Sequence, residues 1–128
     1  MTIELNHTIV PARDPKASAQ FLAGILGLPV DPPVAHFTPI TLANHVTLDY
    51  DQNDDFGSHH YAFLVSDDEF DAAFARIQDS GVTFFADPAC QQPGQIYRSR
   101  GRRGTYFRDP DGHLMEILTP TSSGNFAG

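Results

Sequence analysis

An internal repeat is the feature that most constrains the fold of this chain. Two segments show the same order of elements and match at an offset of 53 positions, pairing His7 with His60, Asp14 with Asp67, and Phe21 with Phe74. Each segment reads as a strand, an amphipathic helix and further β-prone runs. The repeat predicts an α+β fold of two tandem modules, about residues 3–52 and 58–119, in a single domain over residues 1–120, with a flexible tail at 121–128.

Both predicted helices have end signals. Asp14 is a good N-cap followed by Pro15, which fits the first helical position. Ser66 begins a capping box in the second module, and Gly81 is a typical helix stop. Each module then reads as strand–helix–strand–strand–strand, or βαβββ. We expect eight short strands in two half-barrel sheets that form a cupped mixed β-sheet, with the helices on the outer faces.

A hairpin is predicted over Gly104–Thr119, with its turn at Asp109–Gly112. Its second strand, within His113–Leu118, places Glu116 in the middle of an apolar run. A buried carboxylate is costly unless it is paired, protonated or bound to a metal. If the strand lies at a sheet edge, Glu116 faces water instead.

Two histidines occupy equivalent places in the repeat. His7 and His60 each lie in the first strand of a module, and Glu116 lies in the last strand of the second module. Two imidazoles and one carboxylate form a ligand set suited to Fe(II) and also able to hold Mn, Co, Ni or Zn. The alternative is that each histidine is hydrogen-bonded within the core without a metal.

The charge balance limits the partners of this protein. The net charge of −8 argues against nucleic acid and anionic membranes. The sequence shows no apolar run long enough to span a membrane and no signal peptide, and its one cysteine, Cys90, fits a reducing compartment. We therefore expect a cytoplasmic protein with a small-molecule substrate.

Five of the eight basic residues fall within eleven positions, and they are Arg98, Arg100, Arg102, Arg103 and Arg108. They form either a local anion site or a solvated loop.

The open half-barrels expose strand edges and apolar concave faces, which predicts a homodimer.

These residues resemble the vicinal oxygen chelate superfamily, which includes glyoxalase I, extradiol dioxygenases, fosfomycin-modifying transferases and bleomycin-resistance proteins. The resemblance spans Leu5 to Thr119, and its most specific segment is Tyr106–Glu116. Asn6-His7, Asp14 and His60–Phe63 also match. The resemblance implies paired βαβββ modules, a metal held by His7, His60 and Glu116, and dimers whose sites in many cases combine modules from two chains.

The resemblance leaves the reaction open. Extradiol dioxygenases have a tyrosine at the position of Tyr106, but also a histidine upstream, where this chain has Tyr97, Arg98 and Ser99. The fosfomycin transferases have a threonine where Ile9 stands and an arginine beyond the metal glutamate, and no arginine follows Glu116 here.

Glyoxalase I would require a fourth metal ligand from the last strand of the first module. In the alignment of the two repeats Leu48 matches Glu116, and Asp49 is adjacent but on the opposite face.

The resulting hypothesis is an enzyme that uses a divalent metal ion to chelate two oxygens of a small substrate, either anionic or neutral, by lyase, isomerase or dioxygenase chemistry. Glu116 and Tyr106 are the predicted catalytic residues, with Tyr106 also contacting substrate beside the space left by Gly104. Arg102 and Arg103 are predicted to overhang the site and bind an anionic group. The alternative is a metal-free antibiotic-binding protein of the bleomycin-resistance type.

Overall fold

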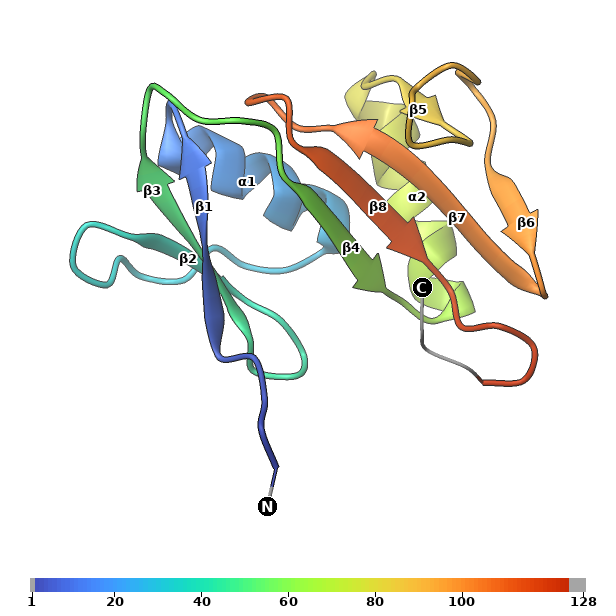
Figure 1. The fold of residues 1–128 in the computed structure, drawn as a ribbon, viewed down its shortest axis with the longest axis horizontal. Coiled ribbons are helices and arrows are strands. Elements are labelled where there is room, and N and C mark those ends of the chain that lie inside the picture. The colour runs from blue at the N-terminus through green and yellow to red at the C-terminus, as the bar shows by residue number, and fades with distance from the viewer. Residues whose placement is uncertain (1, 125–128) are drawn as a thin grey trace. The chain divides into compact units, whose positions relative to one another are not determined.

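The computed structural model describes residues 2–124, which form two compact units (Figure 1), the first ending at Gly57 and the second beginning at Ser58. One predicted module falls in each unit. Of the tail predicted at 121–128, residues 125–128 lie outside the described residues. Neither helix between residues 2 and 124 has the length and hydrophobicity required of a membrane span.

The first unit contains four elements: β1 (His7–Ala12), α1 (Pro15–Leu26), β2 (Thr38–Thr41) and β3 (Thr47–Gln52). Its sheet has the order β1-β3-β2, with β1 parallel and β2 antiparallel to β3. Helix α1 packs against all three strands. The core between them is apolar, with Val10, Leu22, Ile40 and Tyr50 completely buried.

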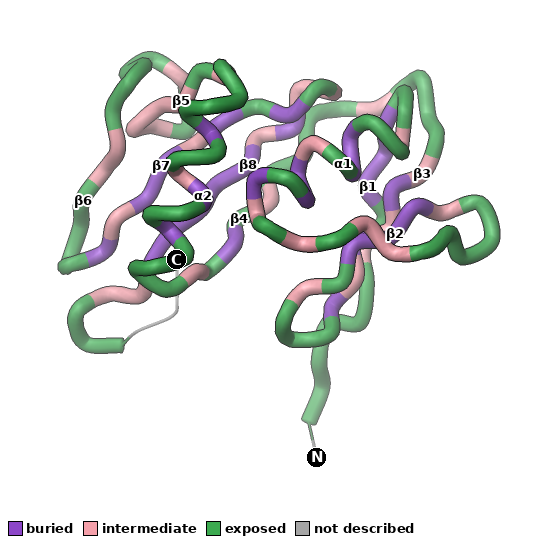
Figure 2. The backbone as a smooth tube through the Cα atoms, turned by 180° about the vertical axis from the view of Figure 1, so that it is seen from behind, coloured by how far each residue is buried: buried purple, intermediate pink, exposed green. Residues whose placement is uncertain are grey.

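The second unit contains six elements: β4 (His60–Leu64), α2 (Asp67–Ser80), β5 (Phe84–Phe85), β6 (Tyr97–Ser99), β7 (Arg102–Arg108) and β8 (Leu114–Leu118). Its sheet has the order β4-β8-β7-β5, and β6 pairs with β7 beside β5. Strand β4 is parallel to β8, while β7 runs antiparallel to its partners. Buried residues follow β7, β8 and the inner side of α2 (Figure 2).

The fold class is α+β, as predicted, and both helices begin and end where expected. The Asp14 side chain accepts a hydrogen bond from the Ala17 backbone N–H, and Ser66 forms a complete capping box with Glu69. Each helix ends at a glycine in the left-handed region, so the termini follow directly from local sequence chemistry.

The eight strands are divided differently from the prediction of four per module. The first unit has three, because Val34 and Phe37 form only an isolated bridge. The second unit has five, because residues 97–99 also form a strand, β6, on the outer side of β7. This additional strand brings new side chains to the candidate site.

The turn between β7 and β8 forms at Asp109–Gly112, as predicted. Gly112 has φ 83° and donates its N–H to the Asp109 carbonyl oxygen at 3.0 Å. The Asp109 carboxylate accepts from the backbone N–H of His113 at 2.8 Å, and burial raises the pKa of Asp109. His113 is fully buried and accepts from the His59 N–H at 2.9 Å, so it joins the turn to the residue that precedes β4.

The strand registers correct the alignment of the two modules at their last strands. Ile9 pairs with Asp49 in the first sheet, and Ala62, the equivalent of Ile9 in the repeat, pairs with Glu116 in the second. Asp49, rather than Leu48, is therefore the equivalent of Glu116. A shift of one residue reverses the face on which a strand side chain lies, so Asp49 is on the same face as Ile9 and Leu48 is in the core.

Candidate functional site

Glu116 lies in the middle of β8 with its carboxylate largely withdrawn from solvent. The residue is 6% exposed, and its neighbours Met115 and Ile117 point to the opposite side of the sheet, where they are completely buried. Ala62 of β4 and Tyr106 of β7 flank it in register. The expectation that this carboxylate is buried and paired is confirmed, because a different side chain contacts each of its oxygens.

His60, the first residue of β4, has its imidazole anchored at one nitrogen. Its Nδ1 lies 2.9 Å from the carbonyl oxygen of Leu114, which can only accept, so Nδ1 carries a hydrogen. In a neutral imidazole Nε2 is then an acceptor, and it lies 3.1 Å from Oε1 of Glu116. Two acceptors therefore face each other unless the imidazole is protonated or a cation lies beside both.

This pair of side chains fits a divalent metal ion. Metal-binding histidines are held by a hydrogen bond from the other ring nitrogen, as Nδ1 of His60 is here. Two ligand atoms at about 2.1 Å from one ion and at right angles are about 3 Å apart. The 3.1 Å between His60 Nε2 and Glu116 Oε1 matches that separation.

His7 occupies in the first unit the position that His60 occupies in the second. It begins β1 and is exposed, and its Nδ1 lies 2.8 Å from the side-chain oxygen of Asn6. The amide oxygen only accepts, so Nε2 of a neutral His7 is also left as an acceptor. Within residues 2–124 no three His, Cys, Asp or Glu side chains form a group able to hold a metal, and the pair that the structure brings together is His60 and Glu116.

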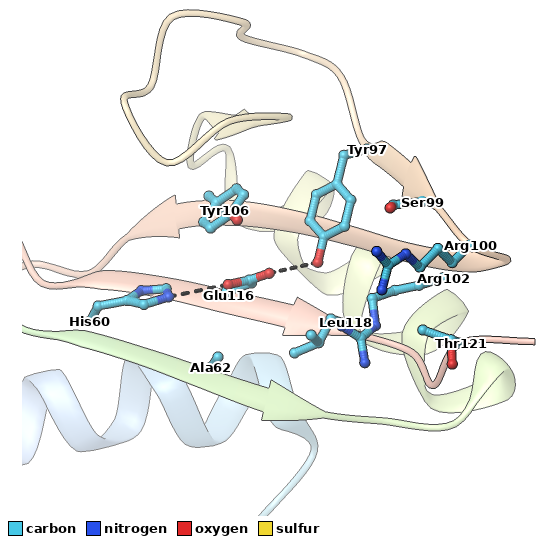
Figure 3. A pocket seen from close by; sticks show the side chains of 10 residues that line it. All are labelled: His60, Ala62, Tyr97, Ser99, Arg100, Arg102, Tyr106, Glu116, Leu118 and Thr121. Atoms are coloured by element: carbon cyan, nitrogen blue, oxygen red, sulfur yellow. Dashed lines mark hydrogen bonds and ion pairs between the residues drawn. The ribbon is translucent and has the colours of Figure 1, made fainter. Parts of the chain in front are cut away.

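Tyr97 of β6 contacts the second oxygen of Glu116. Its hydroxyl donates to Oε2 at 2.6 Å (Figure 3). The ring lies over Gly104, where an added Cβ would be 2.2 Å from Tyr97 Cζ. Sequence reasoning expected the missing side chain of Gly104 to leave room for substrate; that expectation was wrong, because the tyrosine ring fills the space.

Tyr106 lies on the same face as Glu116, as predicted, since the two residues pair across β7 and β8. Its ring centroid is 6.0 Å from that of His60 and 5.7 Å from that of Tyr97. Burial, with a further contribution from the negative charge of Glu116, raises the pKa of Tyr106 to about 12. Burial and the hydrogen bond to Glu116 also raise the pKa of Tyr97, so both hydroxyl groups are protonated donors at neutral pH.

These side chains line one pocket of about 570 Å³. Its lining residues are His60, Ala62, Tyr97, Ser99, Arg100, Arg102, Tyr106, Glu116, Leu118 and Thr121 (Figure 3). The aromatic and carboxylate groups come from β4, β6, β7 and β8, and the two arginines come from the β6–β7 hairpin. The pocket therefore combines two side chains that fit a cation with two arginines.

The two arginines hold defined conformations. Arg102 is 6% exposed, and its Nε donates to the Thr119 carbonyl oxygen at 2.7 Å. Arg100 has φ 54°, in the left-handed region, and its carbonyl oxygen accepts from the Ser122 N–H at 2.9 Å. Sequence reasoning placed Arg100 in the basic cluster but did not select it as a site residue.

Arg103 lies on the other side of β7, which contradicts its expected place at the mouth of the site. Its guanidinium donates to Asp71 at 2.8 Å and to Asp67 at 3.0 Å, and it lies over the Phe70 ring at 4.5 Å. The physical reason is strand alternation, which sends Arg102 and Arg103 to opposite faces. Arg103 is therefore a link between the sheet and α2.

Comparison with known proteins agrees with this architecture. The family model for the Glyoxalase/Bleomycin resistance protein/Dioxygenase superfamily matches residues 4–117. The chain belongs to this superfamily, and the resemblance predicted from sequence is confirmed.

Among individual proteins, the chain is 30% identical over 128 residues to metallothiol transferase FosB of Lysinibacillus sphaericus (strain C3-41), covering 94% of this chain and 86% of that protein. It is 29% identical to glutathione transferase FosA of Serratia marcescens, covering 91% of this chain and 81% of that protein. Among solved structures, oxidase ChaP-H2 is similar with a TM-score of 0.92 and 53% identity, covering 98% of this chain and 100% of that chain.

Proposed function

We propose that this protein is a divalent-metal-dependent oxidase that acts on a small substrate bearing two neighbouring oxygens. The observation that carries the proposal is the pairing of His60 Nε2 with Glu116 Oε1 at 3.1 Å, while Nδ1 of the same imidazole is held by the Leu114 carbonyl oxygen at 2.9 Å. The 53% identity to oxidase ChaP-H2 over 98% of this chain favours oxidation over the other reactions of the superfamily. FosB, FosA and ChaP-H2 all have the names of enzymes, which supports the prediction of an enzyme over a metal-free binding protein.

His7 is the third proposed ligand, because it matches His60 in the repeat and its Nε2 is also left as an acceptor. It would come from the same chain or from the second copy in the proposed homodimer. The dimer is supported by the end strands of the two sheets, β1 and β4, which expose Ile9 and Leu64 at 46% each. The bound ion, one of Fe, Mn, Zn, Ni or Co, would supply a Lewis acid that stabilises negative charge on the substrate oxygens.

The other lining residues have roles that follow from their positions. Tyr106 donates a hydrogen bond to a substrate oxygen next to Glu116, and its pKa of about 12 keeps the hydroxyl protonated. Arg100 and Arg102 bind an anionic group at the other end of the pocket. The rings of Tyr97 and Tyr106 and the side chain of Leu118 favour a substrate with a flat apolar body.

The register of the first sheet favours one second candidate, an isomerase of the glyoxalase I type. Asp49 is the equivalent of Glu116 in the repeat and shares a face with Ile9, so the first module does supply a carboxylate at the position where that reaction would require a ligand. An Asp49→Asn variant distinguishes the oxidase from the isomerase. If the protein is the oxidase, the variant should bind the metal ion as tightly as wild type, and if it is the isomerase, the variant should bind the ion more weakly.

The proposed function is tested by loading metal-free protein with Fe(II), Mn(II), Co(II), Ni(II) or Zn(II) under anaerobic conditions and measuring affinity by calorimetry. The loaded protein is then assayed with three panels: oxygen uptake with catechols and hydroquinones, thiol addition to epoxides, and isomerisation of hemithioacetals. Metal-dependent oxygen uptake supports the oxidase. Activity in either other panel without oxygen uptake contradicts it, and absence of metal binding contradicts every metal-dependent function.

Replacing Tyr106 by Phe is expected to reduce kcat by about ten- to a hundredfold with little change in KM. The loss corresponds to one hydrogen bond to a charged group that forms mainly in the transition state. Steady-state kinetics on the substrate identified above measures it. A rise in KM at constant kcat would show instead that Tyr106 serves only substrate binding.

Replacing Arg100 by Asn is expected to raise KM for an anionic substrate by about tenfold or more, because a charge-assisted hydrogen bond is lost. The free energy of unfolding should not fall, since Asn tolerates the left-handed backbone at this position better than Arg. Arg103→Ala is the control, with unchanged KM and a loss of stability of about 1 kcal/mol, because the carboxylates that pair with Arg103 are exposed. Equal KM values for wild type and Arg100→Asn would remove Arg100 from the binding site.

A further inference from the structure

Tyr97 reaches the candidate metal site from an outer strand of the sheet. It belongs to β6, which pairs with β7, and β7 in turn pairs with β8, where Glu116 lies. Two strand spacings separate β6 from β8, about 9–10 Å. A side chain on β6 can touch a side chain on β8 only by lying flat across the strand between them.

Gly104 permits this crossing. It is the register partner of Tyr97 on β7, and any larger residue there would place its Cβ 2.2–2.3 Å from three atoms of the ring, Cζ, Cε2 and the hydroxyl oxygen. The glycine is not required by its backbone, because its φ is not in the left-handed region. The ring above it accounts for the need for glycine.

The contact at the far end of the ring is directed at one oxygen of the carboxylate. The Tyr97 hydroxyl donates to Oε2 of Glu116 at 2.6 Å, and Oε1 is turned toward His60 Nε2 at 3.1 Å. A carboxylate held at one oxygen by a donor presents the other oxygen in a fixed direction. Such contacts around metal ligands orient them before the ion binds.

We propose that Tyr97 is a positioning residue for Glu116, and that Gly104 is small in order to admit its ring. The hydroxyl fixes Oε2, so that Oε1 is the oxygen offered, together with His60 Nε2, to a divalent ion. This role rests on the proposed metal-dependent function. It assigns to Tyr97 a task distinct from that of Tyr106, which donates toward the substrate.

The test is the affinity of metal-free protein for Mn(II) and Co(II) alone, measured by calorimetry in the absence of substrate. Tyr97→Phe is expected to bind about 10- to 100-fold more weakly than wild type. Tyr61→Phe is the matched control, since its hydroxyl, on the strand of His60, contacts His59 Nδ1 at 2.8 Å and lies outside the pocket. The control should bind the ion as wild type does.

Gly104→Ala tests the geometry through a different residue. Its methyl group must displace the Tyr97 ring, so the variant should lose as much affinity as Tyr97→Phe with the tyrosine still present. In a Tyr97→Ala background, which has no ring to displace, Gly104→Ala should cause no further loss. Thermal unfolding of each metal-free variant separates a general loss of folding from a loss of ligand orientation.

The outcomes are distinct. Wild-type protein that binds neither ion overturns the proposed function and this role together. If wild-type protein binds the ion and Tyr97→Phe binds it equally well, the role of Tyr97 is overturned and the proposed function stays intact. The same holds if Gly104→Ala weakens binding equally in the wild-type and Tyr97→Ala backgrounds.

Discussion

Replacing Glu116 by Gln is expected to weaken binding of a divalent ion by more than about a hundredfold. This loss exceeds the one expected for Tyr97→Phe, which removes a hydrogen bond to the ligand and not the ligand itself. The reason is that the amide removes the negative charge while keeping the shape of the side chain. Calorimetric titration of metal-free protein with Mn(II) or Co(II) measures the change.

The same variant has a second expected signature. Without metal and with a neutral His60 imidazole, its free energy of unfolding should equal or exceed that of wild type, because an amide can accept from Tyr97 and donate to His60 Nε2, whereas the wild-type carboxylate then faces an acceptor at 3.1 Å. Glu69→Gln is the control, a matched carboxylate-to-amide change in the capping box of α2. Wild-type metal affinity in Glu116→Gln would show that this carboxylate is not a ligand.

Phe107→Ala is expected to lower the free energy of unfolding by about 3–5 kcal/mol. Phe107 is completely buried on the side of β7 that faces away from the pocket, between its register partners Phe84 and Met115. A loss of this size is a large part of the stability of a typical domain. Urea unfolding followed by circular dichroism measures it.

Two further variants show whether the Phe107 effect arises from burial. Phe107→Leu should lose less than the alanine variant because it leaves a smaller cavity. Phe56→Ala should lose little, since Phe56 is only partly buried and its ring lies under Arg13. If the free energy of unfolding of Phe107→Ala falls by less than about 1 kcal/mol, the surrounding side chains have moved to fill the cavity.

Much of this fold could be predicted because its signals are local. The caps at Asp14 and Ser66 and the turn at Asp109–Gly112 are chemical patterns a few residues long, and the structure confirms each of them. The burial of Glu116 also followed from the apolar run around it. Those features require no knowledge of distant contacts.

The errors came from register and from an unpatterned segment. Strand alternation places Arg103 on the side of β7 that faces α2, and the same rule applied with the observed register selects Asp49 over Leu48. Tyr97 was missed because β6 has three residues and shows no periodic pattern. The one sequence signal for Tyr97 was Gly104, a glycine that no turn explains. Its small size can be interpreted only once the Tyr97 ring, which comes from another strand, is known to lie over it.

The β6–β7 hairpin also has a consequence for how this protein can change. It carries Tyr97, Arg100 and Arg102, whereas His60 and Glu116 belong to the neighbouring pair of strands, β4 and β8. Under the proposed function, the arginines that bind the substrate lie within residues 98–103, whereas His60, Tyr97, Tyr106 and Glu116 lie outside that segment. Under the proposed function, an exchange of residues 98–103 for those of a relative would redirect the enzyme toward another substrate and spare the groups that perform the reaction, which makes this hairpin the natural unit for laboratory evolution.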